Sequence, residues 1–119
     1  GAVATSVAHD SHNIITVGCN DDDIAVAVNA IKDSKGGIAV VENGKIKALL
    51  ELPIAGLMSD EPLTTVNEKL ENAKLSAYEL GADKSIDPFM TLSFLSLPVI
   101  PSLRITTKGV FDAENWKML

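Results

Sequence analysis

Residues 38–52 read IAVVENGKIKALLEL, and this stretch predicts a β-hairpin. Two apolar-rich runs flank Asn43-Gly44, the dipeptide that best fits a two-residue type I′ turn, since both turn positions need a positive φ. Such a turn pairs Glu42 with Lys45 and Val41 with Ile46. We therefore expect two antiparallel strands, Ile38–Val41 and Lys45–Leu52.

Helices are predicted on both sides of this hairpin. Asn20 is a suitable N-cap for the first helix, because Asp21–Asp23 then lie at the positive end of the helix dipole. Gly36-Gly37 ends that helix. A second helix is expected from about Asp60 to Leu80, where apolar residues recur at spacings of three and four, with Pro62 tolerated in its first turn.

The remaining segments complete an α+β pattern. A short third helix is expected after Asp87-Pro88, an N-cap followed by the first helical position. Its body is apolar on nearly every face, which is typical of a helix that is deeply buried or covered by another domain. We expect one domain over residues 1–119, with a mixed, largely antiparallel sheet and two to three packed helices. The other predicted strands are Ala2–Ala8, Asn13–Val17, Arg104–Thr106 and Val110–Asp112.

Composition excludes several classes of function. The chain of 119 residues carries a net charge of −6 and has no run of Lys or Arg, so we expect no nucleic-acid partner. Its longest apolar run, residues 89–100, is too short and too polar to span a bilayer. A single cysteine, Cys19, favours a reducing, cytoplasmic compartment. We expect no signal peptide, and a strand-like segment directly after Gly1 suggests a domain of a longer protein.

Both histidines lie within five consecutive residues, His9-Asp10-Ser11-His12-Asn13. Histidine titrates near neutral pH, so this cluster concentrates such chemistry at one place. On a regular strand His9 and His12 would point to opposite faces, and without a third histidine they do not complete a common metal site. Two interpretations stay open. Asp10, Ser11 and Asn13 make turn hydrogen bonds in a polar loop, or the loop presents its polar groups to a ligand held mainly by another domain.

A second candidate is the segment Pro53–Asp60. Gly56 permits a tight or left-handed backbone, and Ser59-Asp60 leads into the second predicted helix. Ser59 and Asp60 either cap that helix, a purely structural role, or contact an anion or polar ligand at its start.

Five blocks of the sequence resemble the C-terminal domain of bacterial and archaeal adenine deaminases. They occur in the order of that family and extend over nearly the whole chain, with no departure at His9–Asn13. The variable parts are the helix surfaces and the Asn43-Gly44 turn. The blocks are Ser6–Ile14, Leu52–Asp60, Asp87–Leu95, Leu97–Pro101 and the region of Lys108-Gly109.

The resemblance implies a parent enzyme of the amidohydrolase type that converts adenine and water to hypoxanthine and ammonia. It implies a divalent metal, manganese or iron, bound by a preceding barrel domain of the same chain, and a homo-oligomeric parent. This chain would then hold no cofactor itself and have no activity alone. The residues that would contact the purine pocket, or support the groups that do, are His9, Asp10, Ser11, His12, Asn13, Ser59 and Asp60.

Two other functions compete with this accessory role. One is an autonomous small-molecule-binding module that uses the His9–Asn13 loop. The other is a structural domain whose apolar surface, such as the Phe89–Leu95 segment, packs against a second copy or another domain.

Overall fold

A four-stranded antiparallel sheet forms the middle layer of the molecule. The computed structural model describes residues 1–9 and 12–119. The sheet order is β2-β1-β3-β4, and every neighbouring pair is antiparallel, which confirms the predicted α+β class. The strands are β1 (Ala2–Thr5), β2 (Ile15–Gly18), β3 (Gly37–Glu42) and β4 (Lys45–Glu51).

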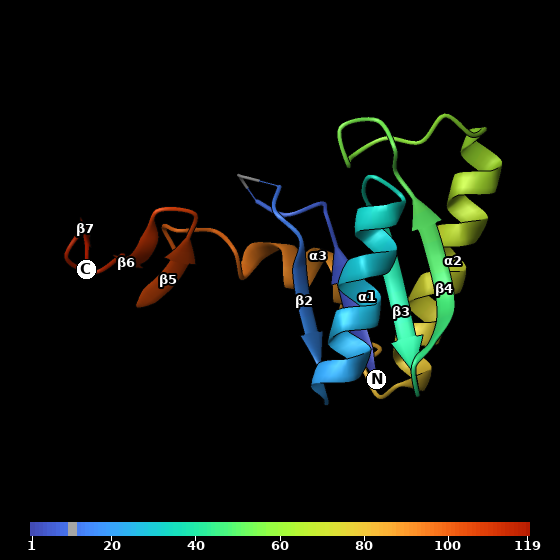
Figure 1. The fold of residues 1–119 in the computed structure, drawn as a ribbon, viewed down its shortest axis with the longest axis horizontal. Coiled ribbons are helices and arrows are strands. Elements are labelled where there is room, and N and C mark those ends of the chain that lie inside the picture. Colours follow the sequence, from blue (N-terminus) through green and yellow to red (C-terminus); the bar gives the residue numbers. More distant parts are fainter. Residues whose placement is uncertain (10–11) are drawn as a thin grey trace.

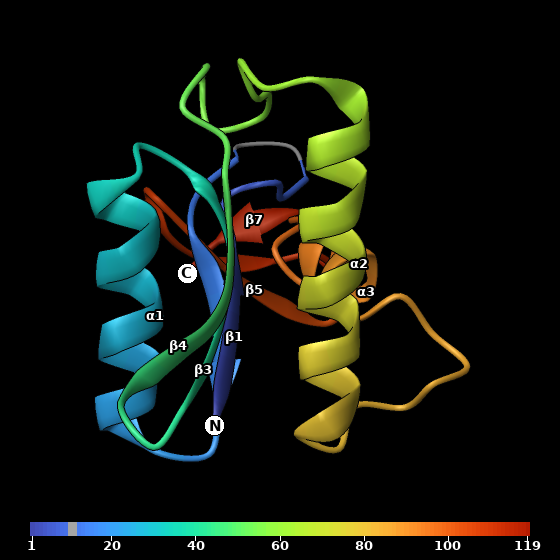
Figure 2. The same ribbon diagram turned by 90° about the vertical axis from the view of Figure 1, so that its right-hand side faces the viewer.

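Helices cover both faces of this sheet, as Figure 2 shows. Helix α1 (Asp21–Asp33) lies on one face, and α2 (Leu63–Glu79) and α3 (Pro88–Phe94) lie on the other. The predicted cap of α1 is confirmed, because Asn20 Oδ1 accepts from the Asp23 N–H at 2.8 Å. The predicted cap of α3 is confirmed too, since Asp87 Oδ1 accepts from the N–H groups of Phe89 and Met90.

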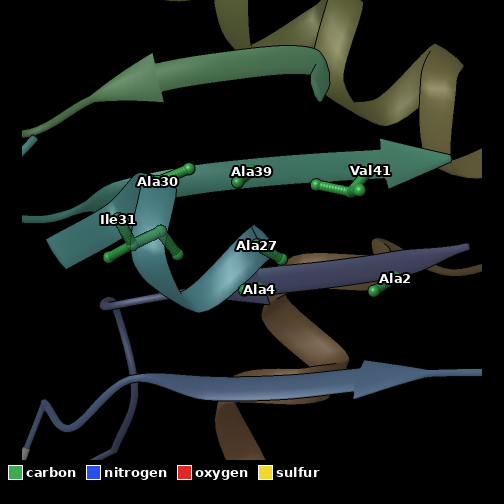
Figure 3. Packing of buried hydrophobic residues seen from close by; sticks show 7 residues of the cluster. All are labelled: Ala2, Ala4, Ala27, Ala30, Ile31, Ala39 and Val41. Atoms are coloured by element: carbon green, nitrogen blue, oxygen red, sulfur yellow. The ribbon is translucent and has the colours of Figure 1, made fainter. Parts of the chain in front are cut away.

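The core is divided by the sheet into two layers because side chains alternate along each strand. The layer beneath α1 is built mainly from alanines, which lets the helix approach the sheet closely (Figure 3). Ile31 is its largest fully buried side chain. The layer on the other side of the sheet contains Ile38, Val40, Leu50, Leu52, Ala73, Ala77 and Phe89.

The hairpin has the register that its turn predicts, with Val41 opposite Ile46 and Glu42 opposite Lys45. Asp23 of α1 holds the turn in place, because its buried carboxylate accepts from the Gly44 N–H at 2.7 Å. This hydrogen bond, followed by that of the Asn20 side chain, holds the pKa of Asp23 below its ordinary value of 3.8. The first helix is thereby fastened to the hairpin.

Several predicted boundaries are wrong. The two N-terminal strands are shorter than expected, since β1 ends at Thr5 and β2 begins at Ile15. The Ser6 N–H still bonds to the Gly37 carbonyl of β3, but the Val7 N–H turns to Thr5 Oγ1 and the His9 N–H to the Ser93 carbonyl. The second helix begins at Leu63 and not near Asp60, with Pro62 as an N-cap that makes no side-chain hydrogen bond.

The predicted final hairpin is confirmed, but it belongs to a second sheet. Strands β5 (Leu103–Thr106), β6 (Gly109–Asp112) and β7 (Lys117–Met118) form an antiparallel sheet of their own. In Figure 1 this C-terminal sheet projects to one side of the body, beyond β2 and α3. Within the described residues, no helix is long and apolar enough to cross a bilayer.

Candidate functional site

The candidate residues lie at one end of the four-stranded sheet, where β1 and β4 end and β2 and β3 begin (Figure 1). The β1–β2 connection contains His9, His12 and Asn13, and the β4–α2 connection contains Ser59 and Asp60. Asp10 and Ser11 lie outside the described residues, so the roles expected of them stay predictions. The structure therefore brings the two predicted segments to the same end of the sheet.

His9 is held against the C-terminal end of α3. Its backbone N–H donates to the Ser93 carbonyl at 3.2 Å, and its carbonyl accepts from Ser96 Oγ at 2.7 Å. The imidazole stacks on the Phe94 ring with a centroid separation of 4.8 Å and an interplanar angle of 13°. Three contacts with one segment fix both the backbone and the ring plane of His9.

His12 closes a turn on Ala8. Its N–H donates to the Ala8 carbonyl at 2.9 Å, while its Nδ1 accepts from the Ala8 N–H at 3.3 Å. A neutral imidazole whose Nδ1 accepts carries its proton on Nε2, so this contact favours Nε2 as a hydrogen-bond donor. The φ of +50° at His12 is in the left-handed region, which non-glycine residues rarely adopt without a structural or functional reason. The side chain is exposed.

Asn13 lies at the rim of a groove between the body and the C-terminal sheet. The groove has a volume of about 790 Å³. Its wall on the body side includes Asn13, Ile14 and Ser96, and its opposite wall includes Arg104 of β5. The polar loop is therefore continuous with a concave surface that the sequence did not indicate.

Helix α3, which supports His9, is itself tied to α2. Lys74 Nζ lies 3.2 Å from Asp87 Oδ2, so the N-cap carboxylate of α3 also forms an ion pair with α2. Burial raises the pKa of Asp87, but the hydrogen bonds from Met90 N–H and Lys74 together outweigh burial and lower the pKa below 3.8. A charged Asp87 thus helps to hold in place α3, the helix against which His9 packs.

Ser59 and Asp60 do not cap α2, so the predicted capping role is wrong. Ser59 Oγ instead accepts from the Glu61 N–H at 3.0 Å, two residues before the helix begins. Pro62 and its fixed φ delay the start of the helix to Leu63. The ligand contact expected of Ser59 and Asp60 stays a prediction, and both residues lie at the site's end of the sheet.

Ser6 links the two candidate segments through hydrogen bonds of its side chain. Its buried hydroxyl donates to the Gly56 carbonyl at 2.6 Å and accepts from the Gly37 N–H at 2.9 Å. Gly56 has a φ of +73°, which confirms that this segment uses a left-handed backbone. The end of β1, the start of β3 and the loop after β4 consequently meet at one serine.

Sequence analysis missed the residues that support the loop from a distance, namely Ser6, Phe94, Ser96 and Arg104. Arg104 could have been noticed as the chain's sole arginine. The partners of the other three become visible only in three dimensions, because they lie between 31 and 87 residues away along the chain.

The described residues do not form a metal site. Across residues 1–9 and 12–119, no group of three His, Cys, Asp or Glu side chains could hold a metal ion. The donors that the structure describes therefore do not fit, by themselves, the divalent ion that the resemblance implies for the parent enzyme.

Taken together, these features define an α+β domain that places a polar loop at one end of a sheet. The chain belongs to the adenine deaminase C-terminal domain family, whose model matches residues 1–117.

Three relatives illustrate this membership. An adenine deaminase from Bacillus pumilus is 51% identical over 119 residues, which is 100% of this chain and 21% of the relative. One from Clostridium acetobutylicum is 53% identical over 120 residues, covering 100% and 21%, respectively. One from Desulfatibacillum aliphaticivorans is 56% identical over 114 residues, covering 96% and 20%. The chain spans about a fifth of the length of these curated relatives.

Proposed function

We propose that this chain is the C-terminal accessory domain of an enzyme that hydrolyses adenine to hypoxanthine and ammonia. Its β1–β2 loop approaches the purine pocket, which the preceding part of the polypeptide mainly forms. The observation that carries the proposal is the family match over residues 1–117, together with relatives that are named adenine deaminase.

The geometry of the loop supports a positioning role. Catalytic polar groups must be held close to their working geometry by the structure around them. His9 has its backbone and ring fixed by the end of α3, and His12 has Nδ1 occupied by a backbone N–H. A loop held in this way can present a polar group in one orientation without rearranging first.

The favoured tautomer of His12 suits a purine ligand. Its Nε2–H is a donor, and the three unprotonated ring nitrogens of adenine are acceptors. Deamination adds water at C6 and expels the amino group as ammonia, so a donor that fixes the base favours attack at one carbon. The amide of Asn13 can both donate and accept, so it is equally able to bind a purine edge.

The chemistry of a divalent ion belongs, in this proposal, to the preceding part of the polypeptide. Such an ion, manganese or iron, would activate the attacking water. This placement is supported by the lack of a suitable donor group across the described residues of this chain. In this proposal the residues of this chain orient the purine and enclose its pocket. We expect the chain to release no ammonia from adenine when it is purified alone.

The proposal is tested in the full-length enzyme with His9→Ala and His12→Ala. We expect kcat/KM for adenine, measured by ammonia release, to fall by about 10- to 100-fold in at least the His12 variant, which is typical of losing a supporting group. Bound metal should be unchanged. Asn67→Ala, which removes an exposed polar side chain on α2, is the matched control and should keep the wild-type kcat/KM.

Different outcomes of these measurements distinguish the candidate functions of the chain. Wild-type kcat/KM in both histidine variants would refute the role of the loop. Adenine binding by the 119-residue chain alone, measured by calorimetric titration, would favour the autonomous binding module instead. Ser59→Ala and Asp60→Asn extend the test to the β4–α2 connection, where we expect a smaller loss if that segment only borders the pocket.

A further inference from the structure

One face of the C-terminal sheet carries three apolar side chains that the described residues leave largely exposed, beside the buried carboxylate of Asp112. Residues paired across neighbouring strands lie on the same face, and β5 and β6 pair Ile105 with Val110. Leu103, two residues before Ile105, shares that face. The side chains of Leu103, Ile105 and Val110 are 52%, 85% and 39% exposed, respectively. We call them the arm face.

The opposite face of the same sheet is partly covered by the chain itself. Phe111 and Met118 lie opposite each other on that face. The Trp116 ring packs edge-on against Phe111, with centroids 5.3 Å apart and planes at 79°. Pro98 and Val99 line a hollow beside these side chains. Trp116 and Met118 stay 67% and 45% exposed, so this face is only partly covered, and Ile105 on the arm face is 85% exposed.

The groove beside the arm face continues this apolar surface onto the body. It is lined by Leu103 and Ile105 on one side and by Ile14, Ile15 and Leu95 on the other. Strands β2 and β5 are both at the edge of their sheets, so each has a row of backbone N–H and C=O groups without a strand neighbour. The groove therefore offers both apolar side chains and backbone hydrogen-bonding groups.

The strands of the C-terminal sheet are short. They have four, four and two residues, and a sheet of three strands gains stability from a packed hydrophobic face, which favours covering the arm face. The relatives are about five times as long as this chain, and the matched family is a C-terminal domain, so a longer part of their polypeptide precedes the matched region. Within one polypeptide that preceding part is tethered to this domain, which gives it a high effective concentration at the arm face.

We propose that the arm face and the groove dock against the preceding part of the same polypeptide. The docking segment is apolar, to match the exposed side chains of the arm face. Docking there would also cover the groove rim that Asn13 lines. The inference rests on the proposed function only in placing this chain after a longer part of one polypeptide.

The test compares two equally exposed apolar positions in the full-length protein. Ile105→Cys probes the arm face, and Leu63→Cys is the matched control, because Leu63 is 83% exposed and lies on α2 away from the C-terminal sheet. Each variant is alkylated under native conditions and in concentrated urea, and mass spectrometry of peptides separates the new thiol from Cys19. We expect docking to slow native labelling at position 105 by about tenfold or more relative to position 63.

A second measurement needs no substitution. Hydroxyl-radical footprinting of the unmodified full-length protein should give lower side-chain oxidation at Leu103, Ile105 and Val110 than at Leu63, after correction for intrinsic reactivity. Lower oxidation at the arm face would support the proposal even if Ile105→Cys disturbs the docked arrangement.

Three outcomes would overturn the proposal. These are equal labelling of the two cysteines, equal oxidation of the two regions, and protection of position 105 that disappears when the protein is diluted to monomers. The last result would assign the arm face to a second copy. Labelling reports contact and ammonia release reports chemistry, so the docking surface and the proposed function can fail separately.

Discussion

Ser6→Ala should destabilise the chain strongly, although it removes a single oxygen atom. The Ser6 hydroxyl donates to the Gly56 carbonyl and accepts from the Gly37 N–H, and all three residues are buried. A buried N–H that loses its acceptor costs about 1–3 kcal/mol, and the second lost hydrogen bond adds about 0.5–1.5 kcal/mol. We therefore expect a loss of about 2–4 kcal/mol in the free energy of unfolding.

Water is poorly placed to restore these hydrogen bonds. A Cβ atom built on Gly36 would lie 2.3 Å from Gly56 Cα, so the two backbone segments that Ser6 bridges are already in close contact. A loss of this size is a large part of the about 5–15 kcal/mol that stabilises a typical domain. It should lower Tm by about 10 °C in a chain of this length.

Urea denaturation of the 119-residue chain, followed by far-UV circular dichroism, measures the effect. Ser85→Ala is the matched control, because the Ser85 hydroxyl makes an exposed hydrogen bond to Asp83 at 2.7 Å. We expect Ser85→Ala to change the free energy of unfolding by no more than about 0.5 kcal/mol. If Ser6→Ala cost no more than this control, the reasoning from buried hydrogen bonds would be refuted.

Two further predictions concern the core and the hairpin anchor. Ile31→Ala should cost about 2–5 kcal/mol and Ile31→Val about 0.5–1.5 kcal/mol, because Ile31 is completely buried between α1 and the sheet. Leu75→Ala, at an exposed position, is the control, and equal losses at 31 and 75 in urea denaturation would contradict the packing described. The pKa of Asp23 is lower in the folded chain than its ordinary value of 3.8. Its charged carboxylate therefore stabilises the fold at pH values above 3.8, and this contribution is lost as the pH falls through the lower, folded pKa. Thermal unfolding between about pH 5 and pH 2 should therefore show a smaller acid loss of stability in Asp23→Asn than in the wild type, and identical pH profiles would contradict the role of Asp23.

Local sequence was sufficient for the elements whose ends are set by neighbouring residues. The Asn43-Gly44 turn fixes the pairs next to it, Glu42 with Lys45 and Val41 with Ile46, although an irregularity between Val40 and Val41 shifts the register further along. The caps at Asn20 and Asp87 were also predictable, since each bonds to N–H groups within three residues. The start of α2 was not, because Pro62 was assigned to the first turn when it precedes the helix.

The candidate site was predicted in composition but not in arrangement. The cluster of both histidines drew attention to the β1–β2 loop, and Gly56 drew attention to the other segment. Neither pattern indicates that His9 stacks on Phe94, or that Asn13 borders a groove closed by Arg104. These contacts depend on where α3 and the C-terminal sheet come to lie.

The sequence by itself determined the hairpin, two helix caps, the apolar stripes of the helices and the α+β class. Each of these depends on contacts among residues close together in the chain, which periodicity and turn chemistry describe. Only the tertiary structure decided the strand order, the division into two sheets, the anchoring of His9 by Ser96 across 87 positions, and the open arm face. The physical reason is that such contacts are selected by the packing of whole elements, and many long-range arrangements are compatible with the same local pattern.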